Sequence, residues 1–244
     1  AEDGIRDSVA SRGLGDVYKR QLWGWGRGDF GELGSGVRVQ RDPGPCACDE
    51  RFAQVSAGSH HCLASTNNGR LYAWGYGEDG ATGLDATAWR PRRVELVQGV
   101  VSDLSAGAAH SLVLVRGAVH ALGTTLNGRA GVPCGNPPVE RAVFDCVRGL
   151  PGDVVRVAAG GEHSLCLTAS GEVYAWGRGG RTGQRSPRDV FAGVEIIRRP
   201  PCHRRDACST THWFISTQVW APTLVQLDQK AVAVAAHAAH SVVA

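Results

Sequence analysis

The sequence predicts an all-β fold built from stacked, repeated units, and three observations support that prediction. First, one phrase occurs four times, and its first three copies are about 50 residues apart; the copies are SAGSHHCLA, SAGAAHSLV, AAGGEHSLC and VAAHAAHSVV. Second, a glycine-rich phrase such as LYAWGYGEDG or VYAWGRGGRT follows each of the first three copies. Third, no stretch shows a sustained apolar period of 3.6 residues bounded by helix caps.

The third unit, residues 154–177, shows the elements of one repeat most clearly. It opens on the β-branched run 154–159, which Gly160-Gly161 ends. A second run of β-forming residues spans 164–168, and a third spans 173–177. Short runs of this kind, split by glycine turns, predict strands joined by tight hairpins.

The fourth strand of each unit has the weakest pattern. Its candidates are residues 92–97, 190–197 and 223–227. Four short strands in a repeat of about 50 residues predict one blade of a β-propeller. With about four repeats, the chain is predicted to form an incomplete ring of about four four-stranded blades.

These phrases resemble a known repeat. A-G-x-x-H-S-L-x-L, then G-x-V-Y-A-W-G-x-G, then G-x-L-G is similar to the repeat of the regulator of chromosome condensation family. The resemblance covers residues 22–244 apart from one long insertion, and it implies a partial copy of a seven-bladed propeller. Two positions depart from the pattern: Leu122 stands where other units have tryptophan, and His237 stands where glycine is expected.

Three sets of recurring residues are interpreted as structural. The histidines are predicted to bond to backbone at a glycine turn rather than to bind a metal; they are His61, His110, His163 and His240. The glycines at that turn are Gly58, Gly107 and Gly160. The aromatics predicted to fill the space between adjacent blades are Trp25, Trp74 and Trp176.

The sequence predicts no catalytic residue, metal site, cofactor or small-molecule substrate. Two GxGxxG strings, from Gly26 and from Gly75, are not followed by a helical pattern, so turn glycines explain them better than a nucleotide site. Cys202, His203, Cys208 and His212 lack the paired cysteines of structural zinc sites. Cys62 and Cys166 occupy equivalent strand positions and are predicted to act as small apolar core residues.

Charge and composition narrow the possible partners and location of the protein further. The 244 residues carry 26 Lys and Arg against 23 Asp and Glu, so net charge alone does not indicate nucleic acid as a partner. No apolar run is long enough for a membrane span. Residues 1–21 match neither repeat phrase and lack the apolar core of a signal peptide, so a disordered or non-native leader is expected. Without a signal peptide, we expect reduced thiols and a location in the cytoplasm or nucleus.

The stretch 178–219 stands apart from the repeats, because it separates His163 from His240 by more than one repeat period. Its arginines are candidates for binding a partner: Arg178, Arg181, Arg185, Arg188, Arg198, Arg199, Arg204 and Arg205. Planar guanidinium groups suit carboxylate and phosphate recognition, and loops on a rigid scaffold often carry binding sites. A merely solvated insertion is the alternative.

The predicted function is therefore a protein-interaction scaffold and not a covalent enzyme. The family resemblance implies a guanine-nucleotide exchange factor for a small GTPase of the Ran type, or a chromatin-binding propeller that contacts the nucleosome. The alternative is a substrate- or partner-recognition propeller of a larger multidomain protein, such as a HECT-type ubiquitin ligase. The plant photoreceptors of this family carry a GWRHT-type phrase, which this sequence lacks.

Overall fold

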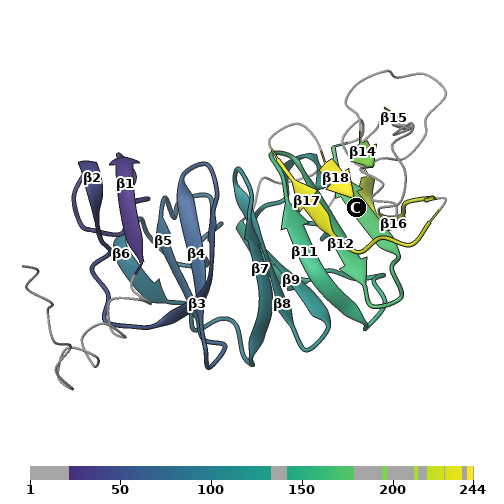
Figure 1. The fold of residues 1–244 in the computed structure, drawn as a ribbon, viewed down its shortest axis with the longest axis horizontal. Helices are drawn as coiled ribbons and strands as arrows, with labels where there is room; N and C mark the ends of the chain where they lie inside the picture. Colours follow the sequence, from purple (N-terminus) through teal and green to yellow (C-terminus); the bar gives the residue numbers. More distant parts are fainter. Residues whose placement is uncertain are drawn as a thin grey trace, which may run out of the picture.

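The structure, a computed structural model, confirms the all-β prediction. It describes residues 22–132, 142–178, 194–196, 212–213, 219–227, 229–237 and 241–243. Within these residues, one 3-10 helix, η1 (Leu126–Gly128), accompanies eighteen strands, and no helix has the length and apolarity that a membrane span requires. Figure 1 shows sheets that follow one another in chain order along an arc.

Three of the sheets are complete antiparallel blades. The first comprises β3 (Phe52–Ala57), β4 (His61–Thr66), β5 (Leu71–Gly75) and β6 (Ala88–Arg93). The second comprises β7 (Val101–Ala106), β8 (His110–Val115), β9 (Ala118–Thr124) and β10 (Ala142–Cys146). The third comprises β11 (Val154–Ala159), β12 (His163–Thr168), β13 (Val173–Gly177) and β16 (Val219–Leu224). Each follows the predicted order of four strands per repeat.

The two ends of the arc carry half blades of opposite kinds. At one end, β1 (Trp23–Arg27) pairs with β2 (Val39–Pro45), and these match the third and fourth strands of a complete blade. At the other end, β17 (Val234–Ala236) pairs with β18 (Ser241–Val243), which match the first and second strands. The other edge of β18 pairs in parallel with β14 (Val194–Ile196), which in turn pairs with β15 (His212–Trp213).

The fourth strands differ from the sequence prediction. The interpretation of residues 190–197 as the outer strand of the third blade is wrong, because β16 pairs with β13 and the short β14 belongs to the β18 sheet. In the first blade, the outer strand spans Ala88–Arg93 rather than residues 92–97. These edge strands contain Pro91 and Pro222, and proline suits an edge where no amide hydrogen is needed. Proline also interrupts the run of β-forming residues by which a strand is recognised in the sequence.

The core lies between successive blades rather than inside each one. Leu63 of β4 and Leu104 of β7 belong to one buried cluster that joins the first and second blades. Leu112 of β8 and Val157 of β11 belong to the cluster that joins the second and third. Each blade therefore buries its apolar face only when its neighbour is in place, as the repeat pattern predicts.

Candidate interaction face

The repeat histidines link each blade to the next through a serine hydroxyl. The Nε2–Oγ distances are 2.8 Å for His61–Ser111, 2.9 Å for His110–Ser164 and 2.5 Å for His163–Ser241. The prediction of a backbone partner is thus wrong for these three, because each ring reaches across to the neighbouring blade. The serine directly follows the next repeat histidine in the sequence, so the recurring His-Ser pair was the signal for this link. His240 lies outside the described residues.

The proton positions in these links follow from the hydrogen bonds. Ser111 Oγ donates to the Ala81 carbonyl oxygen at 2.7 Å, so its one proton is committed. The hydroxyl must then accept from His61, which places a hydrogen on Nε2 of a neutral ring. Burial, assisted by nearby His60, lowers the pKa of His61 to about 4. Burial likewise lowers the pKa of His110 well below its ordinary value.

Two of the three repeat tryptophans fill the space between blades, as predicted. Trp74 and Trp176 are buried, and their Nε1 groups donate to the carbonyl oxygens of Glu32 and Arg129 at 2.7 and 3.0 Å. Both carbonyls belong to the preceding blade. The prediction is wrong for Trp25, which is 61 % exposed. Among the described residues, no blade precedes the β1–β2 sheet to cover it.

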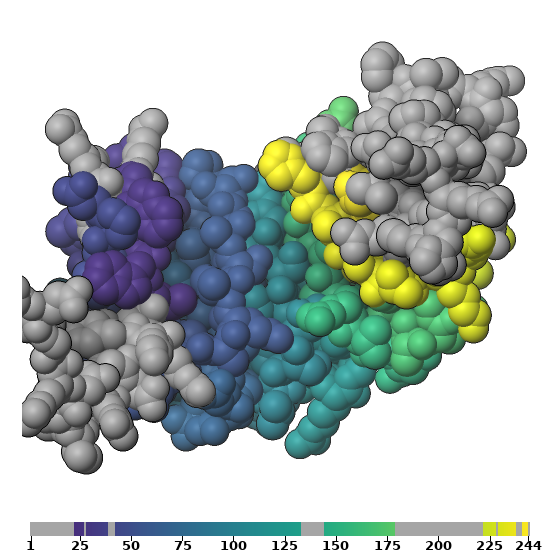
Figure 2. Space-filling model, viewed as in Figure 1, coloured from purple at the N-terminus to yellow at the C-terminus, as the bar shows by residue number. Residues whose placement is uncertain are grey.

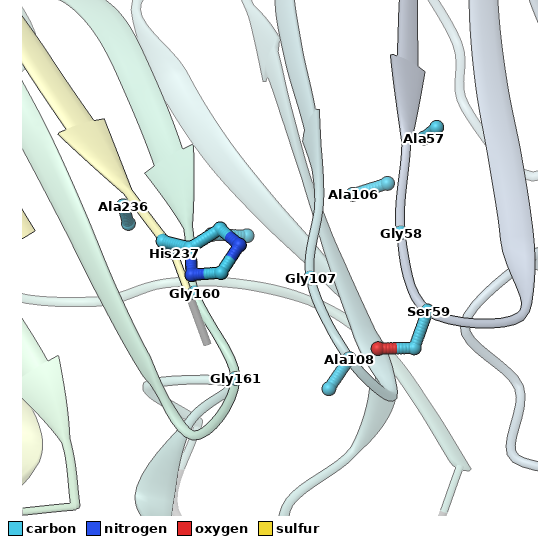
Figure 3. A pocket seen from close by; sticks show the side chains of 11 residues that line it. Ala57, Gly58, Ser59, Ala106, Gly107, Ala108, Gly160, Gly161, Ala236 and His237 are labelled. Carbon is cyan, nitrogen blue, oxygen red and sulfur yellow. The ribbon is translucent and has the colours of Figure 1, made fainter. Parts of the chain in front are cut away.

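The turn glycines allow successive blades to approach closely. A Cβ at Gly107 would lie 2.5 Å from the Gly160 carbonyl oxygen and 2.6 Å from Cε1 of its own repeat histidine. Gly58 and Gly160 are crowded in the same way. Where these turns converge, they line a cavity of about 200 Å³, shown in Figure 3. Its wall is mostly glycine and alanine, with Ser59 and His237, and offers backbone rather than an acid–base pair.

In every blade, the longest connection lies at the same end of the strands as these turns. In each complete blade the second strand begins opposite the end of the third, as in the pairs His61↔Gly75 and His163↔Gly177. The turns between first and second strands therefore share one face with the connections between third and fourth strands. We call it the loop face. The predicted basic insertion leaves the third blade from this face, directly after Arg178.

Arg178 has defined partners, and the other seven candidate arginines lie outside the described residues. Its Nη1 donates to Glu162 Oε2 at 2.8 Å, and its amide donates to the Glu162 carbonyl oxygen. Glu162 also receives Asn127 Nδ2 at 3.1 Å and lies 3.8 Å from Arg129 Nη2. Arg178 thus pairs with Glu162 at the root of the insertion, and because its side chain is 56% exposed, its contact with a partner stays a prediction.

Sequence reasoning missed an exposed aromatic–acidic patch on the loop face, formed by Phe30, Glu32, His60, Tyr76 and Glu78. The Phe30 ring lies 5.0 Å from the His60 ring and 5.4 Å from the Tyr76 ring, edge on in both cases. His60 Nδ1 lies 3.5 Å from Glu32, and Tyr76 donates to Glu78 at 3.0 Å. The sequence signal for this patch is an aromatic residue two positions before a glutamate. It occurs as Phe30 and Glu32 and again as Tyr76 and Glu78, in two successive connections between third and fourth strands.

The described cysteines are free thiols. Cys62 and Cys166 are buried in β4 and β12, and burial raises the pKa of each thiol to about 12. This agrees with the prediction that they act as apolar core residues. Cys202, His203 and Cys208 lie outside the described residues, which contain no cluster of three metal-capable side chains.

Comparison with known proteins identifies the repeat. Models of the regulator of chromosome condensation (RCC1) repeat match residues 21–65, 68–114, 52–81 and 154–184. Human E3 ubiquitin-protein ligase HERC2 is 35% identical over 194 residues, covering 75% of this chain and 4% of that protein. Human regulator of chromosome condensation is 30% identical over 189 residues, covering 72% of this chain and 45% of that protein.

Two solved structures share the fold. Human WBSCR16 superposes with a TM-score of 0.70 at 23% identity, covering 93% of this chain and 53% of that one. Prp20p from Saccharomyces cerevisiae superposes with a TM-score of 0.70 at 22% identity, covering 91% of this chain and 50% of that one. The chain therefore spans about half the length of these propellers.

Proposed function

Because the chain belongs to the regulator of chromosome condensation repeat family, we propose that its propeller is a protein-interaction scaffold whose loop face binds a small GTPase of the Ran type. One observation carries the proposal. One connection makes its repeat much longer than the others. It leaves the third blade on the loop face, where Arg178 and Glu162 form an ion pair at its root. The yeast relative Prp20p is described with its binding properties to Gsp1p and histones.

The scaffold is well suited to hold such a face rigid. Buried clusters join adjacent blades, and each His–Ser link adds a hydrogen bond that fixes one blade against the next. Loops on a rigid frame keep their positions with little loss of entropy on binding. An exchange factor of this kind needs no covalent chemistry, because it accelerates nucleotide loss by binding the nucleotide-free GTPase more tightly than the loaded one.

The test compares two sets of four arginine-to-alanine changes. The first set, Arg198, Arg199, Arg204 and Arg205, removes charge from the insertion. The second set, Arg70, Arg92, Arg116 and Arg148, removes the same charge from exposed positions on β6 and on connections at the opposite end of the blades. We expect the first set to weaken binding of a nucleotide-free Ran-type GTPase and to reduce its salt dependence, and the second set to leave both unchanged.

The readouts are calorimetric affinity at several salt concentrations and the rate of fluorescent nucleotide release from the GTPase. Equal affinity of the parent and the first set at low salt would contradict the role of the insertion. Failure of the parent protein to bind either the loaded or the empty GTPase would contradict the GTPase proposal itself. A nucleosome pull-down in parallel distinguishes a chromatin-binding propeller, the other partner class implied by the relatives.

The 35% identity to a segment of HERC2 favours a second candidate, a recognition module within a larger protein. In that case the loop face would select a substrate or partner for a catalytic domain elsewhere in the protein. Crosslinking and mass spectrometry of the parent protein in an extract, compared with the first arginine set, separates the candidates by the identity of the lost partner.

A further inference from the structure

The aromatic–acidic patch lies over the junction between the β1–β2 sheet and the first complete blade. Figure 2 shows that sheet, in purple, packed directly against the blade, in blue. The patch residues come from the β1–β2 connection, the turn between β3 and β4, and the β5–β6 connection. We propose that the patch binds a basic peptide segment of a partner protein, with one arginine or lysine side chain against the rings of Phe30 and Tyr76.

Three positions of the repeat meet at a junction between blades on the loop face. They are the position seven residues after the tryptophan position of one blade, the residue before the repeat histidine of the next blade, and the second residue after the tryptophan position of that next blade. At the patch these are Glu32, His60 and Tyr76, and between the second and third blades they are Arg129, Glu162 and Arg178. In the second case Glu162 lies 3.8 Å from Arg129 Nη2 and 2.8 Å from Arg178 Nη1, so the chain neutralises this carboxylate itself.

The patch carries two carboxylates without such a cation. Glu32 Oε1 lies 3.5 Å from His60 Nδ1, a contact that is an ion pair only when the ring is protonated. Glu78 Oε2 accepts from the uncharged Tyr76 hydroxyl at 3.0 Å. Among the described residues, no lysine or arginine forms an ion pair with either glutamate. An arginine or lysine of a partner would supply the positive charge that two arginines supply at the other junction.

The aromatic rings offer a surface for the cation and for the methylene groups that carry it. Phe30 is 40 % exposed, and its ring meets the His60 and Tyr76 rings edge on, at interplanar angles of 69° and 72°. A cation is attracted to the face of an aromatic ring, and a planar guanidinium can stack on the ring while it donates to a nearby carboxylate. The patch therefore fits a basic side chain better than an apolar or acidic one.

Contacts within the chain order the patch, and none of them involves the open edge of β1. The Phe30 amide donates to Glu32 Oε2 at 2.9 Å, and Trp74 Nε1 donates to the Glu32 carbonyl oxygen at 2.7 Å. The Tyr76 amide donates to the His60 carbonyl oxygen at 2.7 Å. A surface ordered in this way loses little conformational entropy on binding. The proposal adds a contact of opposite charge to that of the insertion, and it does not rest on the partner being a GTPase.

Fluorescence anisotropy of a labelled arginine–glycine repeat peptide, titrated with the full chain, tests the proposal. The formal net charge of the chain is +3, so its overall charge does not favour a cationic probe, and binding reports a local site. We expect a Kd below about 100 µM at physiological salt. The same peptide with the neutral analogue citrulline in place of arginine should bind at least about 10-fold more weakly.

Variants of the patch locate the binding site. Phe30→Ala should weaken peptide binding roughly 10-fold and Glu78→Gln about 3-fold, because they remove an aromatic face and a negative charge. Phe30→Trp keeps a large ring face and should preserve the parent Kd or lower it. Two matched controls should leave the Kd unchanged. Leu126→Ala changes an apolar residue of similar exposure, 41 %, in the β9–β10 connection, and Glu95→Gln changes an exposed carboxylate between β6 and β7.

Equal binding of the arginine and citrulline peptides would overturn the proposal, as would Phe30→Ala and Phe30→Trp variants that both bind like the parent protein. A chain that binds the peptide only after the four insertion arginines are changed to alanine would show that the insertion occupies the patch, and would overturn the assignment to a partner. A chain that binds the arginine peptide through the patch but binds no Ran-type GTPase would support this proposal while contradicting the proposed function.

Discussion

Trp25 and Trp176 occupy the same place in the same repeated phrase, yet Trp25 is 61 % exposed and Trp176 is fully buried. The local strand is alike in both cases, including the following glycine with its positive φ. The difference lies in the preceding blade, which Trp176 contacts through the Arg129 carbonyl and a buried cluster. A repeat motif therefore specifies the strand and its bulge, whereas the neighbouring unit determines whether the aromatic ring contributes stability.

The largest expected contrast comes from removing each of these two rings in turn. Trp176→Ala should lower the free energy of unfolding by about 3–5 kcal/mol, because it leaves a large cavity in a packed core. Trp25→Ala should change it by less than about 0.5 kcal/mol, because its ring is mostly in water. Urea unfolding of both variants against the parent protein measures the two values. Similar losses for both variants would show that Trp25 is buried in solution by something beyond the described chain.

Acid should act on the enclosed blades through their neutral histidines. Folding lowers the pKa of His61 from its ordinary 6.5 to about 4, so the unfolded chain takes up the proton more readily. Stability is therefore full above pH 6.5, falls as the pH drops toward 4, and has lost this contribution below 4. For His61 alone the loss is about 3 kcal/mol.

Urea unfolding at steps between pH 7 and pH 4 checks this pH dependence. His61→Asn removes the titrating group, so its stability should be lower at pH 7 and should fall less on acidification. The control is His60→Ala, which changes the adjacent exposed histidine and should keep most of the acid dependence of the parent protein. A parent profile that stays flat over this range would mean that the buried rings do not remain neutral.

The sequence predicted the features that each repeat encodes locally. The strands at 154–159 and 173–177, the burial of Trp74 and Trp176, and the turn glycines all follow from a pattern that recurs in a single unit. Two kinds of feature could not be predicted in this way. Outer strands such as β16 carry proline and lack alternation, and the partner of His61 is a serine about 50 residues away, in the next blade.

The loop face shows the same contrast between features that one repeat encodes and features that depend on a neighbouring blade. The sequence located the basic insertion, because it breaks the repeat period, but it did not indicate that Arg178 is already paired with Glu162. Nor did it reveal the aromatic–acidic patch, since Phe30, His60 and Tyr76 come from three separate connections. Composition and spacing describe a single repeat, whereas the patch forms only where two neighbouring sheets bring these side chains together.

The smallest expected contrast, and the most local, lies between two glycines with nearly the same backbone conformation. Gly75→Ala should destabilise the protein through the strain of a positive φ and through a clash, since its Cβ would lie 2.6 Å from the His61 Cα. Gly26→Ala carries the strain without the clash, because nothing lies within 4 Å of its Cβ. The strain is about 1–3 kcal/mol in either variant, and the clash should add about 1–2 kcal/mol at Gly75.

Urea unfolding of both variants against the parent protein measures this difference. An equal loss for the two variants would mean that the place beside β1 is already filled within a single chain.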